Sequence, residues 1–141
     1  MLNLGRGKYG ENMVIGLDFD GTVVDHCFPD IGAPVPGAIE WLKRFRKAGA
    51  RIILFTMRSD GGQFGNVLTA AVDYLEKNGI DLYGVNENPD QPDWTSSPKP
   101  YAHLYIDDAA VGCPLIHPEN FIRPCADWET IGRIVNDRFD I

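Results

Sequence analysis

The stretch MVIGLDFDGT, residues 13–22, determines how the rest of the chain is interpreted. Its first five residues are a short apolar run, which is typical of a buried β-strand. Two acids, Asp18 and Asp20, follow the run directly, and Gly21 and Thr22 come next. The stretch therefore predicts a strand that ends in a polar turn, with two carboxylates one residue apart that can face a common centre.

The patterns on either side of this stretch predict an α/β fold. Apolar residues recur at helical spacing over 38–48, over about 64–77, and after an Asp127 cap near the end of the chain. Short apolar runs predict strands over 13–17, 51–55 and 103–106, with weaker strands near 82–85 and 115–116. Alternating strands and helices indicate a parallel sheet with both faces covered. We therefore expect a Rossmann-like three-layer α/β/α arrangement around about five strands.

Length and composition are consistent with one domain. The chain has 141 residues, of which 44% are hydrophobic and 23% charged. We interpret residues 1–12 as a flexible N-terminal extension and residues 13–141 as a single domain. No apolar run is long enough to cross a bilayer, so we expect no membrane partner. The three cysteines are widely spaced and form no CxxC pair, which favours reduced thiols and a cytoplasmic location.

The charge of the chain argues against nucleic acid as its main partner. The formal net charge is −7, and an acidic chain gains nothing from the attraction to phosphate backbones that drives most nucleic-acid binding. Five basic residues gather around residues 43–51, but a solvated helix face explains them more simply.

Polar residues follow several of the predicted strands. Ligands of open parallel sheets bind beyond the carboxyl ends of the strands. We therefore expect the residues that follow the strands to converge at one edge of the sheet. These residues are Asp18, Asp20, Thr56, Arg58, Asn86, Glu87, Asp107 and Asp108.

The acids in this group predict a metal site. Four carboxylates crowded together repel each other, and a bound cation is the usual remedy. A small set of oxygen ligands suggests Mg²⁺, which retains several waters and takes up a substrate phosphate. Opposite the acids we expect Thr56, Arg58 and Lys99, a hydroxyl and two cations that suit a dianionic phosphoryl group.

Magnitudes support such a combined site. Hydrolysis of a phosphate monoester needs a barrier reduction of well over about 20 kcal/mol, whereas general acid catalysis alone supplies roughly 3–5 kcal/mol. An acid pair would fall far short without a metal, a nucleophile and a phosphoryl clamp. Simpler interpretations of residues 18–22 are an acidic turn or a calcium loop. A calcium loop of the EF-hand type has its Gly at the sixth position and follows a helix, unlike this stretch.

In the order in which they occur, these motifs resemble the haloacid dehalogenase (HAD) superfamily of phosphatases. The resemblance spans roughly residues 13–135 and includes an Asp-Asp pair after the strand at 103–106. It implies that Asp18 attacks phosphorus and that Asp20 acts as acid and base. It also implies that Thr56 and Lys99 hold the phosphoryl oxygens. The ligands of Mg²⁺ would be Asp18, Asp107 and the backbone carbonyl of Asp20, supported by Asp108, Gly21 and Thr22.

The intervals between the motifs are too short for the cap domain that many HAD enzymes insert. The chain thus resembles the small capless group, whose open sites take large substrates or borrow a lid from another subunit. Homo-oligomerisation is therefore an open alternative. An Arg commonly follows the Asp-Asp pair in such relatives, whereas this chain has Ala109. Ala109 therefore weakens any inference about the substrate from those relatives.

The expected activity is Mg²⁺-dependent hydrolysis of a small phosphorylated metabolite. Acids near the site would repel a polyanion. A phosphatase that acts on 3′ or 5′ nucleic-acid ends is still an alternative, because the position of Arg58 resembles that of an Arg in such capless enzymes. A receiver-like phosphoryl-binding module is a further alternative, although its acid pair would come first in the chain. The last alternative is an interaction protein with an acidic face.

Overall fold

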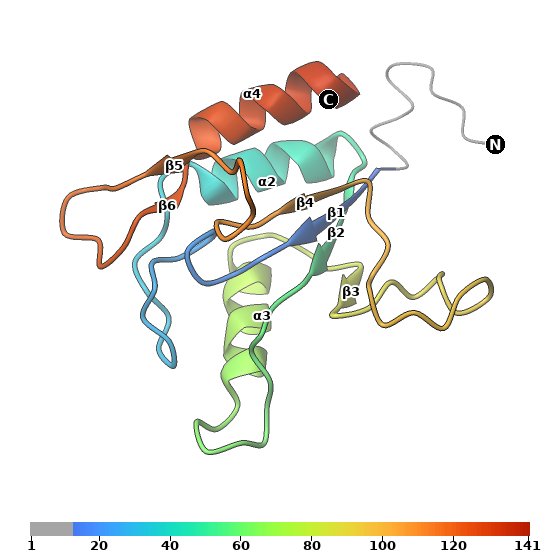
Figure 1. Cartoon of the computed structure of the whole chain (residues 1–141), viewed down its shortest axis with the longest axis horizontal. Coiled ribbons are helices and arrows are strands. Elements are labelled where there is room, and N and C mark those ends of the chain that lie inside the picture. The colour runs from blue at the N-terminus through green and yellow to red at the C-terminus, as the bar shows by residue number, and fades with distance from the viewer. Residues whose placement is uncertain (1–12) are drawn as a thin grey trace.

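The computed structural model describes residues 13–141, so the expected flexible extension over residues 1–12 lies outside the described residues. A parallel sheet of four strands has the order β3-β2-β1-β4 (Figure 1). Its strands are β1 (Val14–Leu17), β2 (Arg51–Leu54), β3 (Gly84–Val85) and β4 (Leu104–Ile106). The helices of the described residues are α2 (Ala38–Lys47), α3 (Val67–Lys77) and α4 (Trp128–Phe139). The predicted α/β class is confirmed.

Strand β1 lies inside the sheet, between β2 and β4. Leu17 stands opposite Leu54 on one side and Ile106 on the other. All of its residues are buried, which explains why the strand is a continuous apolar run instead of an alternating pattern. Asp18 therefore leaves the sheet from a central position.

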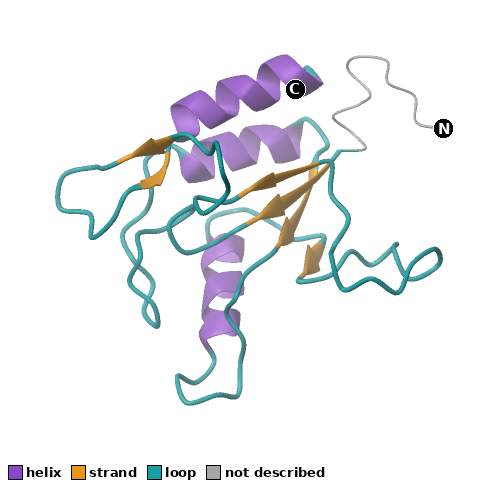
Figure 2. Ribbon diagram, viewed as in Figure 1, coloured by secondary structure: helices purple, strands orange, loops and turns teal. Residues whose placement is uncertain are grey.

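All helices of the described residues pack on one face of this sheet. Ile15, Leu17, Ile52 and Leu54 belong to one hydrophobic cluster that also includes the buried side chains of α2, α3 and α4. Figure 2 shows α2 and α4 running side by side. The connections from β1 to β2 and from β2 to β3 proceed in the same direction across the sheet. Right-handed crossovers therefore place α2 and α3 on the same side.

The opposite face carries a much smaller cluster. Val14 and Ile53 pack there with Ala102, and Tyr83 lies against them. The segment 86–102 between β3 and β4 supplies this cover and contains no helix. The expected cover of helices on both faces is thus not found in residues 13–141, because the crossover to β4 is a loop.

The prediction that residues 115–116 add a fifth strand to the parallel sheet is wrong. β5 (Leu115–Ile116) instead pairs antiparallel with β6 (Cys125–Ala126), which the sequence patterns did not predict. The intervening turn contains Pro118 and Pro124, and each strand has two residues, too few to give a periodic signal. This small ribbon still serves the first motif, because the backbone N–H of Ala126 donates to the carbonyl of Gly21.

Helix α3 begins at Val67, three residues later than the sequence pattern suggests. Asp60, in the loop before it, accepts hydrogen bonds from the backbone N–H groups of Leu68 and Thr69. A side chain from outside the helix thus satisfies N–H groups of the first turn, which have no partner within the helix. Among the described residues, none of the helices has the length and hydrophobicity needed to span a membrane.

Candidate functional site

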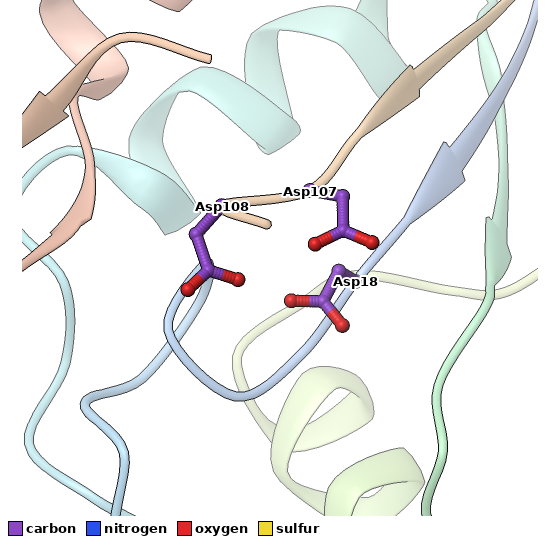
Figure 3. A group of neighbouring side chains, drawn as sticks. All are labelled: Asp18, Asp107 and Asp108. Atoms are coloured by element: carbon purple, nitrogen blue, oxygen red, sulfur yellow. The ribbon is translucent and has the colours of Figure 1, made fainter. Parts of the chain in front are cut away.

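Three carboxylates meet at the carboxyl edge of the sheet. Asp18 follows β1, while Asp107 and Asp108 follow β4, and one oxygen from each lies within 4.8 Å of the others. Figure 3 shows the three side chains converging from these two strand ends. The two strands are neighbours, because the backbone N–H of Asp18 donates to the carbonyl of Ile106 at 2.9 Å. The sheet therefore creates this acidic cluster, as the sequence predicts.

The electrostatics of this cluster favour a cation. Burial, a hydrogen bond with Asp108 and the charge of Asp107 together raise the pKa of Asp18 to about 8. A cation among the three carboxylates would relieve the repulsion and favour the ionised form. The donor set consists of carboxylate oxygens alone, which suits a hard divalent ion. The described residues thus fit a metal such as Mg²⁺.

Thr22 links the two halves of the acidic cluster. Its Oγ1 lies 2.8 Å from Oδ2 of Asp18 and 3.3 Å from Oδ1 of Asp108, and it accepts the backbone N–H of Asp108 at 3.0 Å. The indole N–H of Trp128 donates to the carbonyl of Thr22 at 2.7 Å. The supporting role expected for Thr22 therefore has a structural basis, which includes the first residue of α4.

Gly21 makes room for these contacts. Its φ is +86°, a left-handed conformation that side chains rarely adopt. A Cβ at this position would collide with the carboxylate of Asp108 and the ring of His26. The glycine of the motif is therefore required both by the turn and by the crowding around Asp108.

No motif in the sequence places His26 at the site. In the structure its Nε2 lies 2.9 Å from Oδ2 of Asp108, and both side chains are mostly buried. His26 belongs to no metal-ligand spacing in the sequence. The available signal was its position four residues after Thr22, in the loop that folds back over the motif.

Arg58 does not face the acidic cluster. Its side chain donates at 2.8 Å and 2.7 Å to the two carboxylate oxygens of Asp20. It also donates to the backbone carbonyls of Pro29, Asp30 and Val67. These bonds use all five N–H donors of a guanidinium. Asp20 and loop carbonyls occupy all donors of Arg58 in this arrangement, so the expected contact of Arg58 with a phosphoryl group has no support in the structure.

Asp20 therefore lies next to the acidic cluster but outside it. Its carboxylate is held by Arg58, and the cluster consists of Asp18, Asp107 and Asp108. The expected metal ligand of this residue is its backbone carbonyl. The contact between the side chain of Asp20 and Arg58 does not test that expectation. The carboxylates of Asp18 and Asp20 thus have different surroundings, because Asp18 lies beside two other acids and Asp20 lies beside a guanidinium.

Thr56 follows β2 as predicted. Its backbone N–H donates to Oδ1 of Asn86 at 2.8 Å, and its Oγ1 accepts the backbone N–H of Arg58 at 3.1 Å. The hydroxyl hydrogen of Thr56 has no acceptor among the hydrogen bonds of residues 13–141. Asn86, which has a left-handed φ of 55°, therefore joins the ends of β2 and β3, and Thr56 retains a donor for a ligand.

Lys99 is exposed, and the structure does not bring it into contact with the acids. Its Nζ lies 5.3 Å from the centroid of the Tyr105 ring. Within residues 13–141, no ion pair joins Lys99 to a carboxylate. Lys99 belongs to the long loop before β4, so its side chain is the part of the predicted constellation that the fold fixes least.

The loop that carries Lys99 is nevertheless well organised. The amide of Gln91, which is 6% exposed, donates to the carbonyls of Ser97 and Lys99 and accepts the N–H of Tyr101. These three backbone groups flank Lys99 on both sides. Sequence patterns could not reveal this, because a glutamine in a polar, proline-rich loop looks like any solvated residue.

Fold and site together define an α/β protein with an acidic cluster at the carboxyl edge of a parallel sheet. No family model and no curated protein matches the chain. A solved structure of a conserved protein from Bacteroides thetaiotaomicron is 32% identical, with a TM-score of 0.70. The match covers 89% of this chain and 91% of that one. The chain therefore belongs to the same family as that conserved protein.

Proposed function

We propose that this protein is a Mg²⁺-dependent phosphomonoester hydrolase of the HAD type without a cap domain, acting on a small phosphorylated metabolite. The observation that carries the proposal is the cluster of Asp18, Asp107 and Asp108, together with Asp20, which stands two positions after Asp18. The cluster offers a nucleophilic carboxylate beside a cation site. Asp20 offers a second carboxylate in a separate environment.

The proposed reaction has two steps. An oxygen of Asp18 attacks phosphorus, the ester P–O bond breaks, and Asp20 gives its proton to the leaving oxygen. In the second step a water attacks the aspartyl phosphate while Asp20 takes one of its protons. The P–O bond to Asp18 then breaks, so that phosphate is released and both carboxyl groups return to their starting states.

Other residues bind and neutralise the phosphoryl group. Among the described residues the hydroxyl of Thr56 keeps a donor for a ligand at the end of β2, and Lys99, which forms no ion pair there, would supply a positive charge from its loop. Magnesium held by Asp18 and Asp107 would supply positive charge against the phosphoryl oxygens. Thr22 and His26 hold Asp108, and Asp108 in turn adds charge and orientation to the cation site.

The charge of the chain supports a small substrate at a site that has no cap among the described residues. The chain between the motifs contains α2 and α3 with short loops, and nothing of cap size occurs among residues 13–141. The net charge of −7 disfavours a long polyanion. The three cysteines are free, which agrees with a cytoplasmic protein.

The direct test is hydrolysis of p-nitrophenyl phosphate by the purified protein after removal of metals and addition of Mg²⁺. We expect Mg²⁺-dependent turnover that Asp18→Asn abolishes. Asp137→Asn is the matched control, because Asp137 is exposed on α4 and should leave the rate unchanged. Full activity of Asp18→Asn would contradict the proposed mechanism.

A further inference from the structure

Two half-exposed aromatic rings lie together on the sheet face that carries none of the helices of residues 13–141. Phe55 is 40% exposed and Tyr105 is 37% exposed, and their ring centroids are 6.2 Å apart. We call this pair the aromatic platform. Single exposed rings are common, but adjoining ones beside a reactive group suggest a surface that another molecule covers.

The register of the sheet places this platform next to Asp18. Gly16 stands opposite Tyr105 of β4, and one step further the N–H of Phe55 donates to the carbonyl of Leu17 at 2.8 Å. Side chains alternate along a strand, so Asp18 leaves β1 on the same side as Gly16. Phe55 is then the neighbour of Asp18 across the sheet, and Tyr105 lies one row of side chains below, roughly 6.6 Å along the strand.

Gly16 allows Tyr105 to lie close to β1. A Cβ on Gly16 would stand 2.6 Å from Cδ1 of the Tyr105 ring. The hydroxyl of Tyr105 donates to the carbonyl of Pro100 at 2.8 Å, which anchors the ring to the loop that carries Lys99. Tyr105 is therefore held in place by β1 on one side and by the loop of Lys99 on the other.

Lys99 adds a positive charge at the edge of the platform. Its Nζ lies 5.3 Å from the centroid of the Tyr105 ring. In the phosphoryl role proposed above, this side chain would swing from the ring toward Asp18 and would uncover the ring. A molecule with a phosphoryl group at one end and a flat apolar part at the other matches this order of groups.

We propose that Phe55 and Tyr105 bind a flat aromatic ring in the leaving group of the substrate, as in a nucleoside 5′-monophosphate. The proposal rests on the phosphatase function proposed above and names its substrate class. Aromatic side chains stack on nucleobases through dispersion and burial of both faces. The aromatic ring of the substrate would cover this face of the sheet, as helices cover the other face.

The test compares adenosine 5′-monophosphate with ribose 5-phosphate. Both have the same primary alcohol as leaving group, so a difference in kcat/KM reports the contribution of the base alone. We expect the nucleotide to be preferred by at least about tenfold. Phe55→Leu should reduce this preference about fivefold or more and leave ribose 5-phosphate within about twofold. Phe55→Tyr, which keeps a ring, should retain the preference.

Binding separates this proposal from the catalytic one. Calorimetric titration of the Asp18→Asn protein with adenosine 5′-monophosphate in Mg²⁺ measures binding without turnover. Phe55→Leu in the Asp18→Asn background should weaken the affinity for the nucleotide. Equal affinity for the nucleotide and for ribose 5-phosphate would overturn the platform. So would equal losses for both compounds in Phe55→Leu. A wild-type protein that binds the nucleotide through the platform but hydrolyses neither compound would instead overturn the phosphatase function.

Discussion

Arg58 holds both carboxylate oxygens of Asp20, at 2.8 Å and 2.7 Å, and is itself only 2% exposed. The guanidinium also lies 5.1 Å from the ring centroid of Phe19 and 5.3 Å from that of Phe28. Bidentate pairing of this kind fixes orientation as well as charge. Arg58 is therefore a positioning residue for Asp20 and for the loop that follows it.

The first prediction concerns Arg58→Lys. Lysine cannot reproduce a bidentate pair, so Asp20 should lose its orientation as a proton donor. We expect kcat/KM for ribose 5-phosphate to fall by about tenfold or more. The value for p-nitrophenyl phosphate should change much less, because nitrophenolate leaves without a proton. A purely structural role would lower both values alike. In an Asp20→Asn background the same substitution should cause little further loss for ribose 5-phosphate.

The second prediction concerns pH and metal-free stability. The pKa of Asp18 is raised from 3.8 to about 8 in the fold, so the folded state binds a proton that the unfolded chain releases. The metal-free protein should therefore lose stability as the pH rises from about 4 to about 8. Thermal denaturation should show a lower Tm at pH 8 than at pH 5.

Two additions at pH 8 check the cause of this loss. Mg²⁺ should raise the Tm of the wild type by mass action. Asp18→Asn should raise the Tm of the metal-free protein and shrink the response to Mg²⁺. A Tm of the metal-free wild type that is higher at pH 8 than at pH 5 would contradict the crowding of the three carboxylates.

The third prediction compares two glycines with the same backbone conformation. Gly21→Ala should destabilise the protein by about 2 kcal/mol or more and abolish activity, because φ is +86° and a Cβ meets Asp108 and His26. Gly61 has a φ of +85° with nothing within 4 Å of its Cβ position. Gly61→Ala should therefore cost only about 1 kcal/mol. Chemical denaturation and activity assays measure the difference, and equal costs would argue against crowding at Gly21.

The fourth prediction concerns Gln91, which organises the loop of Lys99. Gln91→Glu turns a donor to two carbonyls into an acceptor, so the backbone on both sides of Lys99 should shift. We expect KM for a phosphomonoester to rise severalfold with a smaller change in kcat. Gln63→Glu is the matched control, since Gln63 is exposed in another loop. Unchanged kinetics in Gln91→Glu would show that the position of Lys99 does not depend on this amide.

The sequence by itself determined the strands that carry chemistry and the acids at their ends. The apolar run before Asp18 is continuous because β1 is buried on both faces in the middle of the sheet, and such a run is visible without any structure. The convergence of Asp18, Asp107 and Asp108 then follows from the rule that parallel strands end at one edge. Their types and order were also enough for the resemblance on which the proposed function draws.

Only the tertiary structure decided which partner each side chain has. Arg58 turned from an expected phosphoryl ligand into the partner of Asp20, because the carbonyls that complete its five bonds come from two separate segments. His26 joined Asp108 across 82 residues of sequence. Such pairings depend on long-range folding, whereas patterns of hydrophobicity and turn residues report only local structure. For the same reason the sequence does not reveal the aromatic face beside Asp18, which depends on all helices of the described residues lying on the other side of the sheet.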